Sequence, residues 1–86
     1  MEKAPEDGEV KSHRAAAHMQ WWHYYDALGD YQASFATAEQ IVALSQEAGD
    51  ADAEARGYMF LGATMWRRSE YPQAQAYLEK SLSLAR

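Results

Sequence analysis

The residues best suited to chemistry in this 86-residue chain are three histidines in its first third. His13, His18 and His23 follow one another at intervals of five. On a helix, this spacing rotates each imidazole by ~140° from the one before it. Ligands of one metal ion must converge on a single point. The spacing therefore predicts three separate imidazoles and no metal site.

Acidic residues at positions 50–54, Asp-Ala-Asp-Ala-Glu, open like a calcium-binding loop. Such a loop needs glycine at its sixth position and a carboxylate at its twelfth. Those positions hold Ala55 and Leu61. Acids also stabilise the first turn of a helix through its dipole. We therefore predict a helix N-terminus here and not a cation site.

No other group of side chains indicates catalysis. The chain has no cysteine, which excludes disulfides and thiolate metal sites. Its serines lack the glycine elbow of a hydrolase nucleophile, and its glycines are too scattered to cradle a phosphate. The basic pair Arg67-Arg68 is typical of a solvated helix end. We predict that the protein is not an enzyme and holds no cofactor.

The charge of the chain excludes two large classes of partner. Its net charge is −5, whereas nucleic acids and anionic membranes are bound by clustered lysine and arginine. No apolar run approaches the ~20 residues that span a bilayer, and the first residues lack a signal-peptide core. We expect a cytoplasmic protein that binds neither nucleic acid nor membrane.

The spacing of apolar residues predicts an all-α fold of four helices. Strand formers are scarce, since Val10, Ile41 and Val42 are the only valines and isoleucines. Apolar residues recur every three or four positions from residue 11 onward, with breaks at residues 29–30, 49–50 and 69–70. The first two breaks are Gly-Asp pairs, in which glycine ends one helix and aspartate caps the next.

The helices form two antiparallel hairpins, because connections this short leave consecutive helices side by side. Residues 1–10 carry four acids and no helical period, and we predict a flexible acidic leader ahead of a folded domain of residues 11–86. The two hairpins are repeats, at about 11–48 and 50–86. Identical residues recur at an offset of forty: Ala15 and Ala55, Met19 and Met59, Tyr31 and Tyr71, Ala36 and Ala76, Glu39 and Glu79, Leu44 and Leu84.

The second repeat carries an aromatic residue before Leu-Gly, then a large apolar residue, an aromatic after the turn, and small and large apolar residues. These are Tyr58, Leu61, Gly62, Met65, Tyr71, Ala74, Leu78 and Leu82. This pattern resembles the tetratricopeptide repeat family, in the long variety of about forty residues found in bacterial regulatory and signalling proteins. The resemblance implies a fragment of a right-handed α-solenoid that serves protein–protein interaction. Gly62 and Ala74 suit a close crossing of paired helices.

The first repeat departs from the pattern at the crossing, where Trp21-Trp22 replaces Leu-Gly and Ser34 takes the small position. A tryptophan cannot be buried there as glycine is. Either the first hairpin is splayed or rotated, or Trp22 packs against something outside its own pair.

By resemblance, the binding surface is the concave face formed by the first helix of each repeat. It would comprise Met19, His23, Asp26, Arg56, Met59, Trp66 and Arg67. The cluster of Lys, Arg and Asn with which one branch of the family grips C-terminal carboxylates is absent. The face suits a helix or an extended peptide with large side chains. The alternative is a regulatory or sensory part of a larger multidomain signalling enzyme or transcription regulator.

Aromatic residues surround more than half of the first helix, which therefore needs cover on more than one side. Trp21 and Trp22 point in different directions, and Leu82 and Leu84 face the space where a following helix would lie. Two explanations are open: the chain comes from a longer array, or these residues mediate self-association. For the isolated chain we expect a homo-oligomer, most simply a symmetric dimer.

Overall fold

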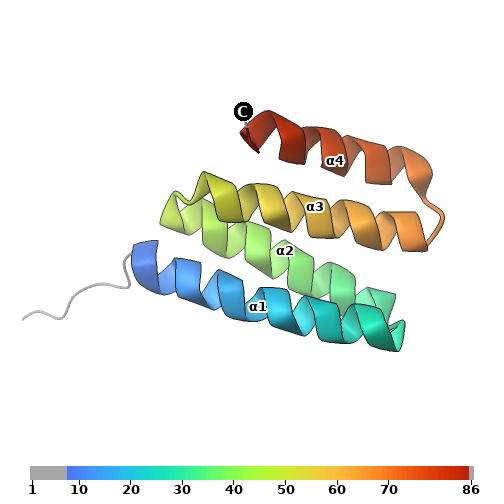
Figure 1. Cartoon of the computed structure of the whole chain (residues 1–86), viewed down its shortest axis with the longest axis horizontal. Coiled ribbons are helices and arrows are strands. Elements are labelled where there is room, and N and C mark those ends of the chain that lie inside the picture. The colour runs from blue at the N-terminus through green and yellow to red at the C-terminus, as the bar shows by residue number, and fades with distance from the viewer. Residues whose placement is uncertain (1–7, 86) are drawn as a thin grey trace, which may run out of the picture.

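Four α-helices make up the computed structural model, which describes the backbone of residues 8–85 and the side chains of residues 13–85. They are α1 (Gly8–Leu28), α2 (Tyr31–Ala48), α3 (Ala51–Arg67) and α4 (Tyr71–Ala85) (Figure 1). Residues 8–85 contain no strand, which confirms the all-α prediction. The predicted leader overlaps α1 by three residues, because the helix begins at Gly8. The rest of that leader, residues 1–7, lies outside the described residues.

The turn between α1 and α2 is built from the residues that the sequence singles out. Gly29 has a φ of 77°, in the left-handed region that glycine adopts without steric cost. Two backbone hydrogen bonds of 3.0 Å end α1: Gly29 N donates to Asp26 O, and Asp30 N donates to Tyr25 O. The Asp30 carboxylate then accepts a hydrogen bond from Ala33 N at 3.2 Å and caps α2.

The other two turns repeat this design. Gly49 has a φ of 70°, and the Asp50 carboxylate caps α3 by accepting a hydrogen bond from Ala53 N at 3.0 Å. Between α3 and α4 the left-handed residue is Ser69, with a φ of 63°. Glu70 N donates to Met65 O at 2.8 Å, forty residues on from the corresponding bond of the first turn. The two hairpin turns therefore share one backbone structure despite their different sequences.

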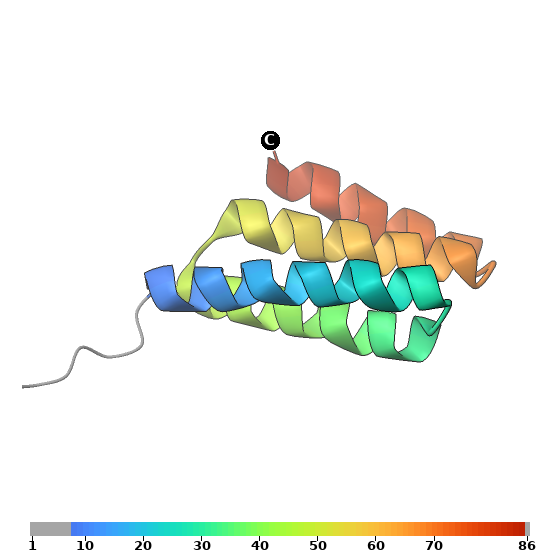
Figure 2. The same ribbon diagram turned by 60° about the horizontal axis from the view of Figure 1, so that its bottom comes forward.

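The helices lie in a row, with α4 at one end and the hairpin of α1 and α2 at the other (Figure 1). α3 packs against each of the other three helices, whereas α4 contacts only α3 within the described part of the chain. Seen from a second direction, α1 runs alongside α3 in front of α2 (Figure 2). The first helices of the two repeats are thus neighbours, and the Cα atoms span 51 × 30 × 12 Å.

The core is centred where α2 and α3 meet, around the buried Ile41 and Leu61. Two glycines of α3 permit close crossings, one with α4 and one with α2. A Cβ on Gly62 would lie 2.8 Å from Leu78 Cγ on α4, which explains the Leu-Gly pair. A Cβ on Gly57 would lie 2.6 Å from Val42 Cγ2, so α2 and α3 also approach closely. No pattern in the sequence indicates that second crossing.

Candidate functional site

Trp22 connects the two repeats. Its indole is only 4% exposed and stacks on Phe60 of α3, with ring centroids 4.5 Å apart. The indole Nε1 donates a hydrogen bond of 3.1 Å to Thr64 Oγ1, and that hydroxyl donates in turn to Phe60 O at 3.0 Å. Of the two arrangements open to Trp22, the structure shows packing outside its own hairpin. Trp22 occupies the position in the first repeat that Gly62 occupies in the second, and its side chain fixes α1 against α3.

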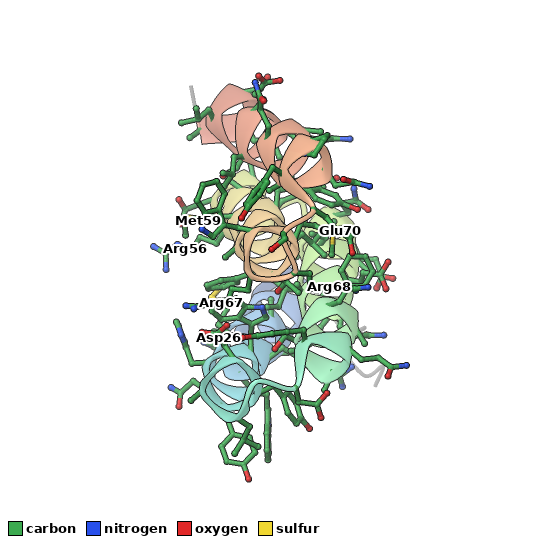
Figure 3. All side chains as sticks on the ribbon, turned by 90° about the vertical axis from the view of Figure 1, so that its right-hand side faces the viewer. Asp26, Arg56, Met59, Arg67, Arg68 and Glu70 are labelled. Atoms are coloured by element: carbon green, nitrogen blue, oxygen red, sulfur yellow. The ribbon has the colours of Figure 1, made fainter. Side chains whose placement is uncertain are left out.

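An ion pair makes a second connection near the ends of the same two helices. Arg67 Nε lies 2.6 Å from Asp26 Oδ1 (Figure 3). The Asp26 side chain is 15% exposed and that of Arg67 is 50% exposed. The contact is ionic in character, because this buried Oδ1 accepts no hydrogen bond among the described residues. The pair holds α1 beside α3 and leaves the outer part of the guanidinium accessible.

These connections bring the predicted binding residues onto one side of the molecule, which we call the α1–α3 face. Figure 3 shows Asp26, Arg56, Met59 and Arg67 along this side. The face comprises Met19, His23 and Asp26 from α1, and Arg56, Met59, Trp66 and Arg67 from α3.

Two large apolar side chains of α3 are open to solvent on this face. Trp66 is 61% exposed and Met59 is 45% exposed. They are seven residues apart, which is close to two turns of helix or ~10 Å. The Trp66 ring meets Tyr71 of α4 edge-on at 4.7 Å, which restrains its direction without covering it.

Apart from the Asp26–Arg67 pair, the polar side chains of the face are only loosely engaged. Arg56 Nη2 lies 3.5 Å from Asp52 Oδ2, but both side chains are more than half exposed, so solvent screens their attraction. His23 is exposed, and its ring meets those of Trp22 and Phe60 edge-on at 5.1 and 5.4 Å. Met19 is half-buried and packs against the core, so it forms part of the floor of the face.

The residues predicted for self-association lie in three different environments. Trp21 is 55% exposed on the outer side of α1, and Leu82 is 60% exposed on α4. Leu84 is half-buried against the core. Trp22 is enclosed within the chain and offers no surface to a second molecule.

Among the residues that the structure describes, no group of three or more His, Asp or Glu side chains could hold a metal ion. Within the same part of the chain, every helix is too short or too polar to cross a bilayer.

The features that sequence reasoning missed are the contacts between α1 and α3. Thr64 belongs to the apolar side of α3, where periodicity predicts only packing, and its role depends on a residue forty-two positions earlier. Asp26 and Arg67 were both predicted at the site, but nothing in their spacing indicated that they pair.

Comparison with known proteins gives one match. A family model described as tetratricopeptide repeat matches residues 14–86. No curated protein and no solved structure matches the chain.

Proposed function

The chain belongs to the tetratricopeptide repeat family, and from this premise we propose that it is an interaction scaffold whose α1–α3 face binds a segment of another protein. Repeats of this family generally mediate protein–protein interaction. The observation that carries the proposal is the exposure of Met59 and Trp66 together, two helical turns apart on one face. Tryptophan is among the residues that most often dominate binding energy at interfaces.

The environment of these two side chains favours a particular kind of partner. They lie beside a wall formed by α1, which the Trp22 and Asp26 contacts hold in place. A partner with two large apolar side chains at matching separation, on a helix or an extended peptide, would cover both. Because the site is fixed before binding, little ordering free energy is lost on association.

The charged residues add a preference at the edge of the face. Arg56 is paired only weakly with Asp52, and the Arg67 guanidinium is half exposed. Both can contact acidic side chains of a partner without first breaking a strong interaction. We therefore propose an acidic amphipathic segment as the partner class, recognised by its side chains and not by a free C-terminal carboxylate.

Peptide selection tests this proposal. Random peptides displayed on phage are selected on the immobilised chain, and the enriched sequences are synthesised with free and with amidated C-termini. Binding is measured by fluorescence anisotropy in dilute solution. Trp66→Ala and Met59→Ala should each weaken binding by about tenfold or more, because apolar anchors at interfaces commonly contribute more than ~1 kcal/mol. Amidation should have no effect.

Trp21→Ala is the matched control, because Trp21 is a tryptophan of similar exposure, 55% against 61% for Trp66, and lies on the outer side of α1, away from the α1–α3 face. It should leave peptide affinity unchanged. The proposal fails if no peptide is enriched, or if Trp21→Ala weakens binding as much as Trp66→Ala does. Far-UV circular dichroism must show the same helix content in every variant. Loss of helix in Trp66→Ala would mean that this residue belongs to the core and that the face is misplaced.

A further inference from the structure

The outer side of α1 carries a stripe of apolar residues that nothing in the described chain covers. Trp21, Tyr24 and Leu28 are 55%, 54% and 62% exposed. With Ala17, one turn earlier, they follow the three-and-four spacing that places residues on one side of a helix. An open depression lined by Ala17, Gln20, Trp21 and Tyr24 lies along this side. We call the four residues Ala17, Trp21, Tyr24 and Leu28 the outer stripe.

The same positions in the second repeat are buried. Forty residues on from the first three members of the outer stripe are Gly57, Leu61 and Thr64 of α3. All three are buried, with Leu61 3% and Thr64 0% exposed. The first hairpin covers them: Val42 of α2 lies against Gly57, and Trp22 of α1 donates a hydrogen bond to Thr64. The outer stripe is therefore the part of α1 that, in α3, receives a preceding hairpin.

The second hairpin leaves the complementary side uncovered. On α2, Ala38 and Val42 are 0% and 8% exposed, and Val42 packs against α3. Forty residues on, Leu78 and Leu82 of α4 are 37% and 60% exposed. Leu78 packs against Gly62 of its own hairpin, whereas Leu82 is at the position through which Val42 meets α3. There α4 presents a larger apolar side chain than α2 does, and it presents that side chain to solvent.

We propose that the chain self-associates head to tail, with the second hairpin of one copy packing against the outer stripe of the next. This contact continues the interface that α2 and α1 already make with α3 inside the chain. Leu82 of one copy would meet Ala17 of the next, as Val42 meets Gly57.

The two surfaces differ and lie at opposite ends of the row of helices (Figure 1). Association between unlike surfaces is heterologous and extends into an open chain unless the rotation closes a ring. A two-fold dimer through the outer stripe would set Trp21 and Tyr24 against their own copies and leave Leu82 exposed. Head-to-tail association therefore replaces the symmetric dimer expected from the sequence.

Complementation between two variants tests the proposal. Trp21→Asp disrupts the outer stripe and leaves the α4 surface intact. Leu82→Asp disrupts the α4 surface and leaves the outer stripe intact. In sedimentation velocity, the unaltered chain should show a mass that rises with concentration beyond two chains. Each variant alone should associate at least about thirtyfold more weakly, the factor usual for a central apolar contact. An equimolar mixture should form a heterodimer that grows no further.

Met59→Asp is the matched control, because Met59 is exposed but belongs to neither of the two associating surfaces. The Met59→Asp variant should self-associate like the unaltered chain. The same variant distinguishes self-association from peptide binding, since it should disrupt only the α1–α3 face. A monomer at hundreds of micromolar overturns the proposal. So does a Leu82→Asp variant that still dimerises fully, which would indicate a two-fold contact through the stripe. If Trp21→Asp loses helix content, Tyr24→Ser takes its place in the same mixture.

Discussion

Replacing Thr64 with valine tests how firmly the two repeats are joined. Valine keeps the shape of threonine but removes the oxygen that accepts the Trp22 Nε1 hydrogen bond at 3.1 Å. Since Trp22 is 4% exposed and Thr64 is 0% exposed, water cannot replace the lost partner. An unsatisfied buried donor costs ~1–3 kcal/mol, and the added methyl group returns a part of this, up to ~0.8 kcal/mol.

We therefore expect the free energy of unfolding to fall by about 1–2 kcal/mol. For a domain of this length each kcal/mol shifts Tm by ~4–8 °C, so Thr64→Val should lower Tm by roughly 5–15 °C. The measurement is urea denaturation followed by far-UV circular dichroism, at concentrations low enough to exclude association.

A double-mutant cycle with Trp22→Phe identifies the cause. Phenylalanine retains an aromatic ring against Phe60 but has no N–H to satisfy. In that background Thr64→Val should cost almost nothing, which gives a coupling free energy of about 1–2 kcal/mol between positions 22 and 64. If Thr64→Val costs the same in both backgrounds, the hydrogen bond does not join the repeats and the reasoning is refuted.

Three further predictions concern the turns and the crossing of α2 and α3. Ser69→Gly should raise the free energy of unfolding by ~0.5–1 kcal/mol, because Ser69 has a φ of 63°, which glycine adopts without steric cost. A lower urea concentration at the denaturation midpoint would contradict this. Asp30→Ala and Asp50→Ala should each cost ~1 kcal/mol in the same assay, whereas asparagine at either position should cost little. Gly57→Ala should cost ~1–3 kcal/mol, because its Cβ would lie 2.6 Å from Val42 Cγ2; an unchanged Tm would show that α2 shifts freely.

The helices and turns could be predicted because their determinants are local. A glycine at a left-handed φ and an aspartate three residues before the amide it caps act within one helical turn. Ser69-Glu70 lacks the glycine and the aspartate of the other two breaks, yet its backbone matches that of Gly29-Asp30. The surrounding hairpin imposes the left-handed conformation on serine, which local preference alone opposes.

The sequence indicates which residues share the proposed α1–α3 face, but it does not indicate the contacts that hold the face together. Helical period places Arg56, Met59 and Trp66 on one side of α3 from the sequence alone. The pairing of Asp26 with Arg67 depends on how α1 lies beside α3. No periodicity within one helix contains that information.

Composition, apolar period and turn residues thus determined a helical, twice-repeated chain and the sides of each helix that are buried. The tertiary structure decided where Trp22 points, which polar group receives its N–H, and which apolar stripes remain uncovered. The physical reason is range. Caps and helical faces are set by atoms a few residues apart, whereas the junction of the repeats rests on side chains about forty residues apart that meet only after the helices have packed.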